Sequence, residues 1–377
     1  MNRSDAIHRH AQDKLRRCGA FILRNIFAGR RIVFLFVVLF PTLFVWLIPG
    51  CTVDPDIPIE TTAEQVKFYV PQGFPQPNYD FSMNPVTLDG FKLGRKLFYD
   101  PKLSRDNTVS CGFCHQQVSA FANTNHQVSH GVDGLLGTRN APGLWNLAWH
   151  TTFMWDGGIT HIELQPLGPI TNPVEMDETI ANVITKLNAD AEYPGMFEAA
   201  FGNDTITTQR ITQAIAQFQG LMISDDSKYD RVLRGGATFT QQEEFGLATF
   251  RSKCASCHTE PLFTDHLYHN NGLAPEPTIM DAGRMIITGN PADSMKFKTP
   301  SLRNIALTGP YMHDGRFTTI SQCLDHYSGG NMYQSATLDP ALSGGIPLTA
   351  QEKSDLTAFL MTLTDYTLIN DPKFAEQ

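Results

Sequence analysis

The sequence has no excess of basic residues, no low-complexity tract and no strong alternation of apolar and polar residues. Lys and Arg number 29 against 38 Asp and Glu, and the resulting net charge of −9 argues against a nucleic-acid partner, which requires a basic face. Hydrophobic residues make up 42% of the 377 positions, which is enough for a packed core and excludes wholesale disorder. The length suits two domains of ordinary size, or one domain with large insertions.

Charged residues are absent from positions 32–50, directly after a basic segment. The apolar run Ile32–Ile48 follows a pair of arginines, so residues 1–50 are expected to be a signal peptide or an N-terminal membrane anchor. The run leads into Pro-Gly and then Cys51, an ending that resembles the lipidation site of bacterial lipoproteins. Lipidation of Cys51 and an uncleaved anchor are both compatible with this pattern, and both predict a periplasmic protein attached to a membrane.

Cysteine is scarce, with seven residues, yet four of them form two Cys-x-x-Cys-His motifs. This spacing is the attachment signature of c-type haem, because two thioethers on one helical turn hold the porphyrin and the adjoining histidine lies under the iron as its ligand. The sequence therefore predicts two covalently attached haems c. The residues that hold them are Cys111, Cys114 and His115 in the first motif and Cys254, Cys257 and His258 in the second.

Two other interpretations of a Cys-x-x-Cys-His motif exist. Half of a zinc site would need further ligands nearby, and neither motif has a second cysteine pair beside it. A redox-active dithiol would be expected between a strand and a helix of a βαβ unit, which the sequence does not show. The remaining Cys323 has no partner in the sequence pattern and is expected to be a small, buried apolar residue.

Helical periodicity recurs after a stretch rich in Pro and Asp at 51–86, which is expected to be a tether and an irregular arm. Apolar stripes predict helices over 178–188 and 207–222. Thr-x-x-Glu capping boxes that begin at Thr240 and Thr349 predict two more. Long loops rich in Gly and Pro separate these helices, so the sequence predicts an all-α protein with large loops around two haems.

The two haem motifs, each followed by its own helices, suggest two cytochrome c-like domains with one covalent haem in each. We expect the first domain, with the peroxide-reactive haem, at 87–228 and the second at 229–377. Outside the haem motifs the two halves share little sequence, so the expected repeat is one of architecture.

Several motifs beyond the haem signature carry a family resemblance. They are the Arg-Asn-Ala-Pro run at 139–142, Trp-Asp-Gly at 155–157, the segments 168–176 and 306–317, and Lys-Thr-Pro-Ser-Leu-Arg-Asn at 298–304. With the order of the haem motifs, they resemble the bacterial di-haem cytochrome c peroxidase and MauG family over nearly all of 86–365, and within it the MauG- and MbnH-like branch. The resemblance implies a haem-dependent enzyme with hydrogen peroxide as its oxidant.

The ligand of the second haem separates the branches of this family. Ordinary family peroxidases have a methionine after the His-Asp-Gly motif, and Tyr327 lies at that position here, as in MauG. A phenolate is a hard, anionic ligand that favours oxidised iron, whereas a methionine thioether raises the reduction potential. The resemblance implies that Tyr327 binds the second iron. The alternative is that Tyr327 is an aromatic residue on a helix face, with Met332 or His326 as the ligand.

The first haem needs a free face if it is to meet peroxide. In ordinary family peroxidases a histidine in the loop before Arg139 covers that face, and the matching position here holds Val132. His130 lies two residues away and is the alternative covering ligand. The resemblance thus implies a five-coordinate first haem.

The resemblance also implies a distal pocket beside the first haem. Trp155 corresponds to the tryptophan between the haems, and the distal positions hold Gln165, Pro169 and Glu175. Cleavage of peroxide needs a group that moves a proton between its oxygens, which suits Glu175, and a polar donor for the departing hydroxide, which suits Gln165. Pro169 would shape the pocket. Taken alone, Glu175 is equally an acidic residue near a helix start, and Trp155 a core residue.

The family further implies a calcium ion between the haems, at positions that hold Asn140, Thr308 and Pro310 here. An Asn side-chain carbonyl and backbone carbonyls are hard oxygen donors of the kind that Ca²⁺ prefers. No pattern in the sequence marks such a site by itself, so this expectation comes wholly from the resemblance.

The resemblance to the MauG- and MbnH-like branch implies an enzyme in which peroxide produces a high-valent state of both irons, which then oxidises a tryptophan of a small exported partner protein over a long distance. MauG has a surface tryptophan two residues before its second haem motif. Ser252 is at that position here, so electrons need another route, with Trp145 and Trp149 as oxidisable residues. The alternatives are a peroxidase supplied with electrons by a small cytochrome or copper protein, and a di-haem electron carrier without peroxide chemistry.

Overall fold

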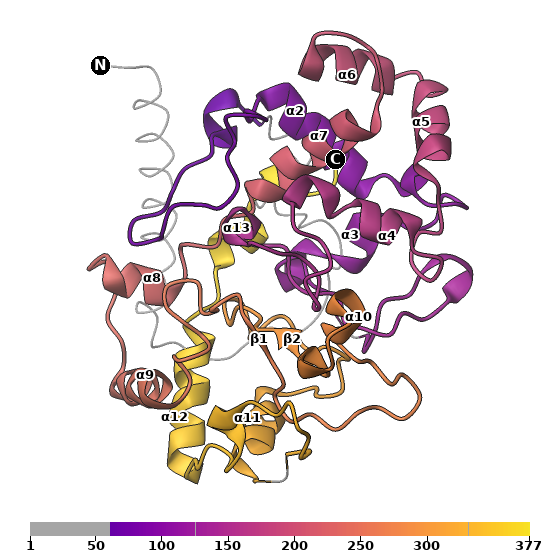
Figure 1. Cartoon of the computed structure of the whole chain (residues 1–377). Helices are drawn as coiled ribbons and strands as arrows, with labels where there is room; N and C mark the ends of the chain where they lie inside the picture. The colour runs from indigo at the N-terminus through magenta and orange to yellow at the C-terminus, as the bar shows by residue number, and fades with distance from the viewer. Residues whose placement is uncertain (1–60, 125, 331) are drawn as a thin grey trace, which may run out of the picture. The chain divides into compact units, whose positions relative to one another are not determined.

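Helices make up most of the regular backbone in the computed structural model, which describes residues 61–124, 126–330 and 332–377 (Figure 1). The α-helices are Leu88–Tyr99 (α2), Cys111–Cys114 (α3), Leu167–Thr171 (α4), Ile180–Asn188 (α5), Tyr193–Phe201 (α6), Thr208–Gly220 (α7), Lys228–Leu233 (α8), Gln241–Lys253 (α9), Met285–Thr288 (α10), Ile320–Ser328 (α11), Ala350–Met361 (α12) and Tyr366–Asn370 (α13). The strands of this part of the chain, Tyr268–His269 (β1) and Phe297–Lys298 (β2), pair antiparallel. The expectation of a mostly helical protein is confirmed, and the short sheet is an addition to it.

The helix boundaries follow the local signals in the sequence. At the start of α9, Thr240 accepts a hydrogen bond from the amide of Glu243, whose carboxylate accepts from the amide of Thr240 at 2.7 Å. Thr349 and Glu352 form the same reciprocal pair at the start of α12. The helices expected over 178–188 and 207–222 are α5 and α7, with ends that differ by one or two residues.

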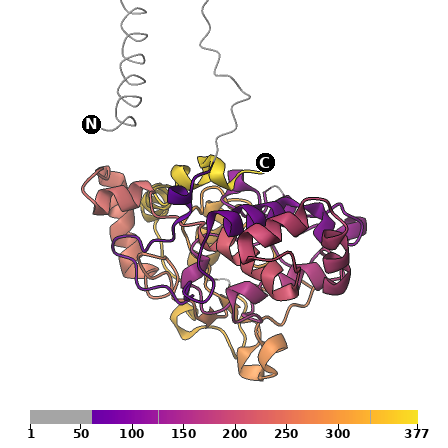
Figure 2. The same ribbon diagram turned by 90° about the horizontal axis from the view of Figure 1, so that it is seen from above.

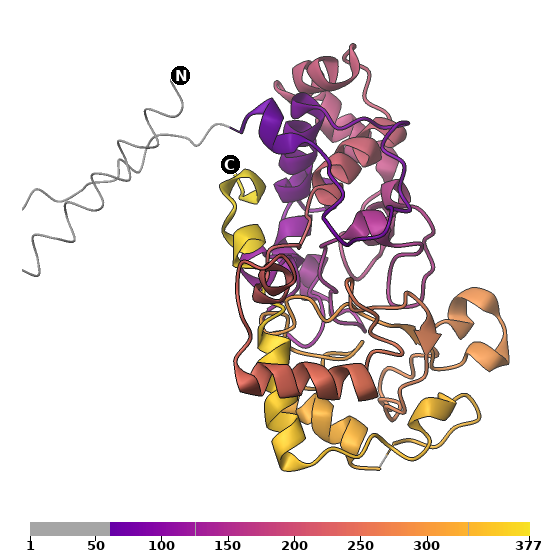
Figure 3. The ribbon, with the colours of Figure 1, turned by 90° about the vertical axis from the view of Figure 1, so that its left-hand side faces the viewer.

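Two pairs of helices cross at close range, one in each half of the chain. Helix α2 packs against α7, and α9 packs against α12, a crossing that Figure 3 shows from the side. Each crossing has a glycine at its contact: a Cβ on Gly94 would collide with the carbonyl of Ala214, and one on Gly246 with that of Asp355. Because α2 and α9 each precede a Cys-x-x-Cys-His motif, the two halves repeat one arrangement despite their different sequences.

The apolar core has three clusters, and one of them reaches across the expected domain boundary. Phe374 packs in the same cluster as Phe91, Phe121 and Phe218, and its carbonyl accepts a hydrogen bond from the Tyr99 hydroxyl at 2.7 Å. Figure 2 shows this C-terminal segment beside the first helices of the described chain. The segment 366–377, expected to belong to the second domain, therefore packs on the first half.

The contacts between residues place the described chain, from Thr61 to Gln377, in one compact unit. They do not separate the two cytochrome c-like domains, so the division into 87–228 and 229–377 stays a prediction. In the described residues no helix has the length and the hydropathy needed to cross a membrane. The apolar run Ile32–Ile48 and Cys51 lie outside the described residues.

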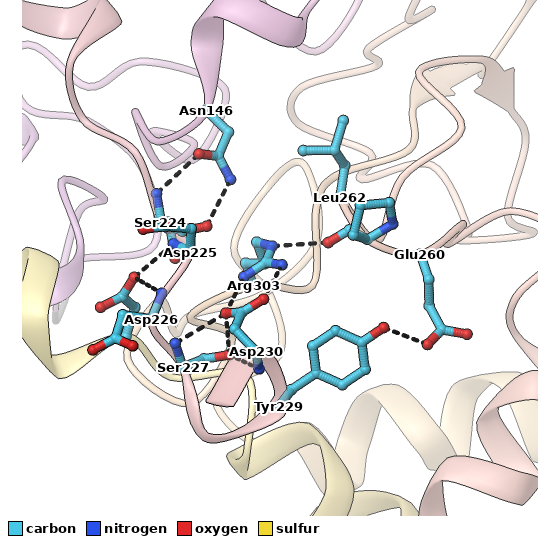
Figure 4. Close-up of polar contacts among 12 residues, drawn as sticks. Asn146, Ser224, Asp225, Asp226, Ser227, Tyr229, Asp230, Glu260, Leu262 and Arg303 are labelled. Carbon is cyan, nitrogen blue, oxygen red and sulfur yellow. Dashed lines mark hydrogen bonds and ion pairs between the residues drawn. The ribbon is translucent and has the colours of Figure 1, made fainter. Parts of the chain in front are cut away.

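A buried ion pair joins the segment between the halves to the second half (Figure 4). The Arg303 guanidinium donates to both carboxylate oxygens of Asp230, at 2.7 and 2.8 Å, and neither side chain is more than 6% exposed. Asp230 also accepts from the hydroxyl of Ser227, the residue before α8. The pair is thus bidentate, and further hydrogen bonds satisfy the carboxylate.

The same arginine fixes the loop that follows the second haem motif. Its Nε donates to the carbonyl of Pro261 at 2.9 Å, and the hydroxyl of Ser301 donates to the carbonyl of Leu262 at 2.6 Å. On the other side, Asn304 donates to the hydroxyl of Ser224, whose amide donates to the side chain of Asn146 in the first half. A continuous polar network therefore connects the two halves beside the haem motifs.

We expect the Arg303→Met variant to lose about 3–5 kcal/mol of unfolding free energy, because it leaves the Asp230 carboxylate buried without its partner. The measurement is chemical denaturation of the haem-loaded protein. Lys353→Ala is the control, since it removes a surface pair with Asp325 and should cost less than about 1 kcal/mol. Equal losses in the two variants would contradict the assigned importance of the buried pair.

Candidate functional site

One cavity of about 910 Å³ connects both Cys-x-x-Cys-His motifs. Every site residue predicted from the sequence lines it. They are Cys111, Cys114, His115, Asn140, Trp155, Gln165, Pro169, Glu175, Cys254, Cys257, His258, Thr308, Pro310 and Tyr327. These residues come from loops and short helices far apart in the chain, and the fold gathers them around a single space.

The two haem motifs have matching local geometry. The amide of His115 donates to the carbonyl of Cys111 at 2.9 Å, and the amide of His258 donates to that of Cys254 at 3.0 Å, so each motif forms one helical turn. In the first motif this turn is α3, which begins where Ser110 caps the amide of Phe113. Both cysteines of each motif therefore lie on the same turn as the histidine, as thioether attachment requires.

The histidine rings are oriented by backbone carbonyls. Nδ1 of His115 lies 2.8 Å from the carbonyl oxygen of Phe121, and Nδ1 of His258 lies 3.1 Å from that of Phe263. A carbonyl accepts only from a protonated Nδ1, which leaves Nε2 of each ring free to bind a metal. Burial lowers the pKa of His115 to about 4 and lowers that of His258, so both rings are neutral, as metal ligands must be.

The alternative chemistries of these cysteines find no support in the geometry. Burial raises the pKa of Cys111 to about 12 and that of Cys254 to about 11, the opposite of the shift found in reactive dithiols. Within the described ranges the one grouping of possible metal ligands is Cys257, Asp265 and His269, which takes a single cysteine from one motif. A closed zinc site of two cysteines and further ligands is therefore not formed.

The distal residues predicted for the first haem share the cavity with His115. Burial raises the pKa of Glu175, which favours the protonated carboxyl group. Gln165 is 8% exposed, and its Oε1 has no hydrogen-bond partner in the structure. A carboxyl group with a raised pKa and an amide whose oxygen has no hydrogen-bond partner among the described residues thus line the same cavity, together with Pro169.

The loop before Arg139 presents a histidine to the cavity. Val132 is 1% exposed, and its amide donates to the carbonyl of Glu175 at 2.8 Å. His130, in contrast, lines the cavity, and it pairs with Leu136 in an antiparallel bridge. Val132, the residue at the position of the covering histidine in family peroxidases, is therefore part of the core. His130 is the residue of this loop that faces the haem space.

The second half of the cavity contains a phenol and a thioether. Tyr327 is half-buried near Cys254 and Cys257, and desolvation raises its pKa to about 12. Its hydroxyl accepts from Nδ2 of Asn271 at 3.5 Å, and the same amide lies 3.5 Å from the sulfur of Met312. Met312 also lines the cavity and is a candidate that sequence reasoning missed.

The other two ligand candidates from the sequence point elsewhere. His326 is hydrogen-bonded to the carbonyl of Asn271 through Nε2 at 2.9 Å, and neither it nor Met332 lines the cavity. Of the three residues weighed from the sequence, Tyr327 alone faces the haem space. Its role as the iron ligand stays a prediction.

Of the residues expected to bind calcium, Asn140 is bonded to Trp155. The indole of Trp155 donates from Nε1 to the carbonyl of Asn140 at 2.8 Å, and the amide of Asn140 donates to the carbonyl of His313 at 2.7 Å. Thr308 and Pro310 line the same cavity. The three residues therefore share one cavity, and calcium binding there stays a prediction.

Of the remaining residues discussed from the sequence, Trp145 lines the cavity, and its buried Nε1 has no hydrogen-bond partner. Trp149 is buried in the core and donates to the carbonyl of Pro75 at 2.8 Å. Cys323 lines the cavity and is half-buried, so it is more accessible than the buried apolar residue that we expected.

The cavity fits two covalently attached haems. Four thiols and two neutral imidazoles lie on its wall in two equivalent sets, and its lining is more apolar than polar, as a porphyrin requires. When present, the first haem would be held by His115 and its two cysteines, and the second by His258 and its two cysteines. The site thus defines a di-haem c-type protein.

Comparison with known proteins gives the family. The model of the di-haem cytochrome c peroxidase family matches residues 89–238. The chain is 35% identical to the methylamine utilization protein MauG of Methylorubrum extorquens, with 81% of this chain and 85% of that protein covered. It is also 35% identical to cytochrome c551 peroxidase of Nitrosomonas europaea, over 75% of this chain and 82% of that protein.

A solved structure of a MauG-like protein associated with microbial copper homeostasis superposes with a TM-score of 0.73 and 36% identity, covering 81% of this chain and 97% of that one. The chain therefore belongs to the di-haem cytochrome c peroxidase and MauG family. Membership implies two c-type haems and a haem-dependent enzyme of the peroxidase type.

Hydrogen bonds from the amides of Gly131 and Val132 fix the loop that carries His130. We therefore expect that His130 does not bind the first iron, and that the ferric protein gives one high-spin and one low-spin signal in electron paramagnetic resonance. The His130→Ala variant should give the same spectrum. Two low-spin signals in the wild type, with a high-spin signal appearing only in His130→Ala, would identify His130 as a ligand and contradict the open first haem.

Proposed function

We propose that this protein is a MauG- and MbnH-like oxidoreductase that uses hydrogen peroxide to oxidise an aromatic residue, a tryptophan, of a small exported partner protein by long-range electron transfer. The observation that carries the proposal is Tyr327, a half-buried phenol that faces the cavity beside the second haem motif. An anionic oxygen ligand favours oxidised iron, so it suits a site that stores oxidising equivalents. The similarity to MauG proteins supports the same branch.

Bound haems supply the reduction of peroxide and a store for the two oxidising equivalents that it yields. With the haem held by His115, Glu175 would take a proton from one peroxide oxygen and return it to the other, which would leave as water. Burial favours the neutral carboxyl group, which helps Glu175 to hold that proton between the two transfers. Gln165 donates from its amide to the departing oxygen and orients it.

Trp155 links the two halves of the cavity. An indole is the protein group most readily oxidised in a reversible way, and Trp155 lines the same cavity as both haem motifs. Its hydrogen bond to Asn140 fixes the ring, so both sites share the oxidising equivalents through one oriented side chain. We further infer that Asn140, Thr308 and Pro310 bind Ca²⁺ next to it.

Long-range transfer follows from the position of the site. A folded partner protein is too large to enter a cavity of about 910 Å³, so its tryptophan is oxidised through the body of this protein. Ser252 is exposed at the position where MauG has its surface tryptophan, so the route lies elsewhere. Trp145, on the cavity wall, and Trp149, in the core behind it, are oxidisable residues on a possible route.

A peroxidase that receives its electrons from a small cytochrome or copper protein is the second candidate function. Two observations favour it: Met312 lies beside Tyr327 in the cavity, and His130 faces the first haem site. The 35% identity to a cytochrome c551 peroxidase points the same way. The two functions differ in the second iron ligand, which the variant below tests.

We infer a periplasmic location, with attachment to a membrane through a lipid on Cys51 or through the N-terminal segment. The basic segment and the apolar run that precede Cys51 support this inference. A periplasmic location agrees with the covalent haems, whose attachment requires free thiols outside the cytoplasm, and with an exported partner protein.

We expect Tyr327→Met to keep both haems but to lose the long-lived oxidised state that follows addition of peroxide, because a thioether favours the reduced iron. Stopped-flow absorption spectroscopy measures that state, and the pyridine haemochrome assay measures haem content. Tyr333→Met is the matched control, since Tyr333 is 44% exposed and lies outside the cavity. An oxidised state of unchanged lifetime in Tyr327→Met would show that Tyr327 is not the ligand.

Glu175→Gln should slow the reaction with peroxide by about 10²-fold or more, because the amide cannot carry the proton between the two oxygens. The second-order rate constant for peroxide measures this step directly. Asp177→Asn serves as the control, since this neighbouring carboxylate pairs with Arg105 and does not line the cavity. If both variants react at the wild-type rate, Glu175 has no role in proton transfer.

A further inference from the structure

A cluster of basic side chains lies at one edge of the cavity without an acidic partner. We call His150, His266 and Lys298 the Lys298 cluster. Nζ of Lys298 donates to the carbonyl of Thr152 at 2.6 Å and lies 3.4 Å from Nδ1 of His150. The rings of His150 and His266 meet edge to face, with their centroids 4.9 Å apart. His150 and Lys298 both line the cavity.

The polar groups of the Lys298 cluster are incompletely satisfied. Both ring nitrogens of His266 are buried without a hydrogen-bond partner. Neither described partner of Lys298 Nζ carries a negative charge, and burial lowers the pKa of this lysine to about 8. The charge of Asp156 acts to raise the pKa of Lys298, but the Asp156 carboxylate is paired with Arg139 at 2.5 Å. Buried donors and cations of this kind are costly unless an acceptor with negative charge faces them.

The Lys298 cluster also has a defined position between the two halves. Lys298 is in β2, opposite Tyr268 of β1, and its amide donates to the carbonyl of Trp155 at 2.7 Å. His150 and Thr152 belong to the segment that leads to Trp155. The basic groups are therefore held beside the tryptophan between the haem sites, where an uncompensated positive charge would oppose oxidation of its indole.

We propose that the Lys298 cluster is a carboxylate-binding site and that the carboxylate is a propionate of one of the two haems. Each haem c has two propionates, and the cavity wall must hold them. A propionate at this edge gives Lys298, which lines the cavity, a counter-charge. It also removes the net positive charge beside Trp155. A small carboxylate from solution has the same chemistry and is the other possible source.

Resonance Raman spectroscopy of the haem-loaded protein tests the proposal without a variant, because the propionate bending band responds to hydrogen bonding. For the wild type we expect this band of one haem to shift between H₂O and D₂O, since the donors are exchangeable N–H groups. In Lys298→Met the band should move to the position of a propionate without this donor. Lys298→Arg, which retains a cation, should keep a hydrogen-bonded band.

Reduction potentials give an independent measurement. Removal of a buried positive charge next to a haem should lower the potential of that haem in Lys298→Met and leave the other haem unchanged. The matched control is Lys296→Met, which makes the same change of charge two residues away, at a lysine that pairs with Asp293 and does not line the cavity. That control should keep both wild-type potentials.

Two results would overturn the proposal. One is a propionate band that is insensitive to D₂O in the wild type and unchanged in Lys298→Met. The other is an effect of acetate, added at constant ionic strength, on a haem potential of the wild type but not on that of Lys298→Met. This result would show that the site is open and takes its carboxylate from solution. Absence of an acetate effect, with the expected band shifts, supports the propionate.

Discussion

The buried pair between Arg303 and Asp230 determines how the second haem motif faces the cavity. The Arg303 guanidinium donates to the carboxylate of Asp230, which lies in α8. Its Nε donates to the carbonyl of Pro261 in the loop after His258. Two residues further along this loop, the carbonyl of Phe263 orients the His258 ring. The pair therefore connects the segment between the halves to the orientation of an expected iron ligand. A buried ion pair is weak support for stability in general, but this one specifies an arrangement.

Similar halves contain different chemistry. Both have a crossing pair of helices with a glycine at the contact, and a Cys-x-x-Cys-His turn that follows the first helix of the pair and has its histidine held by a carbonyl. The side chains that face the cavity differ, with Glu175 and Gln165 in one half and Tyr327 with Met312 in the other. Because the two halves repeat the backbone around their haem motifs, a few loop residues are enough to give the two sites different side-chain chemistry.

The features that sequence reasoning predicted are those with local signals. Capping boxes at Thr240 and Thr349 begin helices because their hydrogen bonds span three residues, and the haem motifs form one turn each. The contact of Arg303 with Asp230, 73 residues apart, has no such signal and depends on packing. The same holds for His130: counting along the sequence selected Val132, whereas the loop buries the valine and turns the histidine toward the cavity.

The return of Phe374 to the first half has a consequence for biosynthesis. Gln117, two residues after the first haem motif, donates to the carbonyl of Asp371, a separation of 254 residues. The core around Phe121 therefore cannot close until the distant segment with Phe374 has been synthesised. Cys111 and Cys114 thus lie on an open chain for most of synthesis, whereas Cys254 and Cys257 are made much closer to the moment of closure.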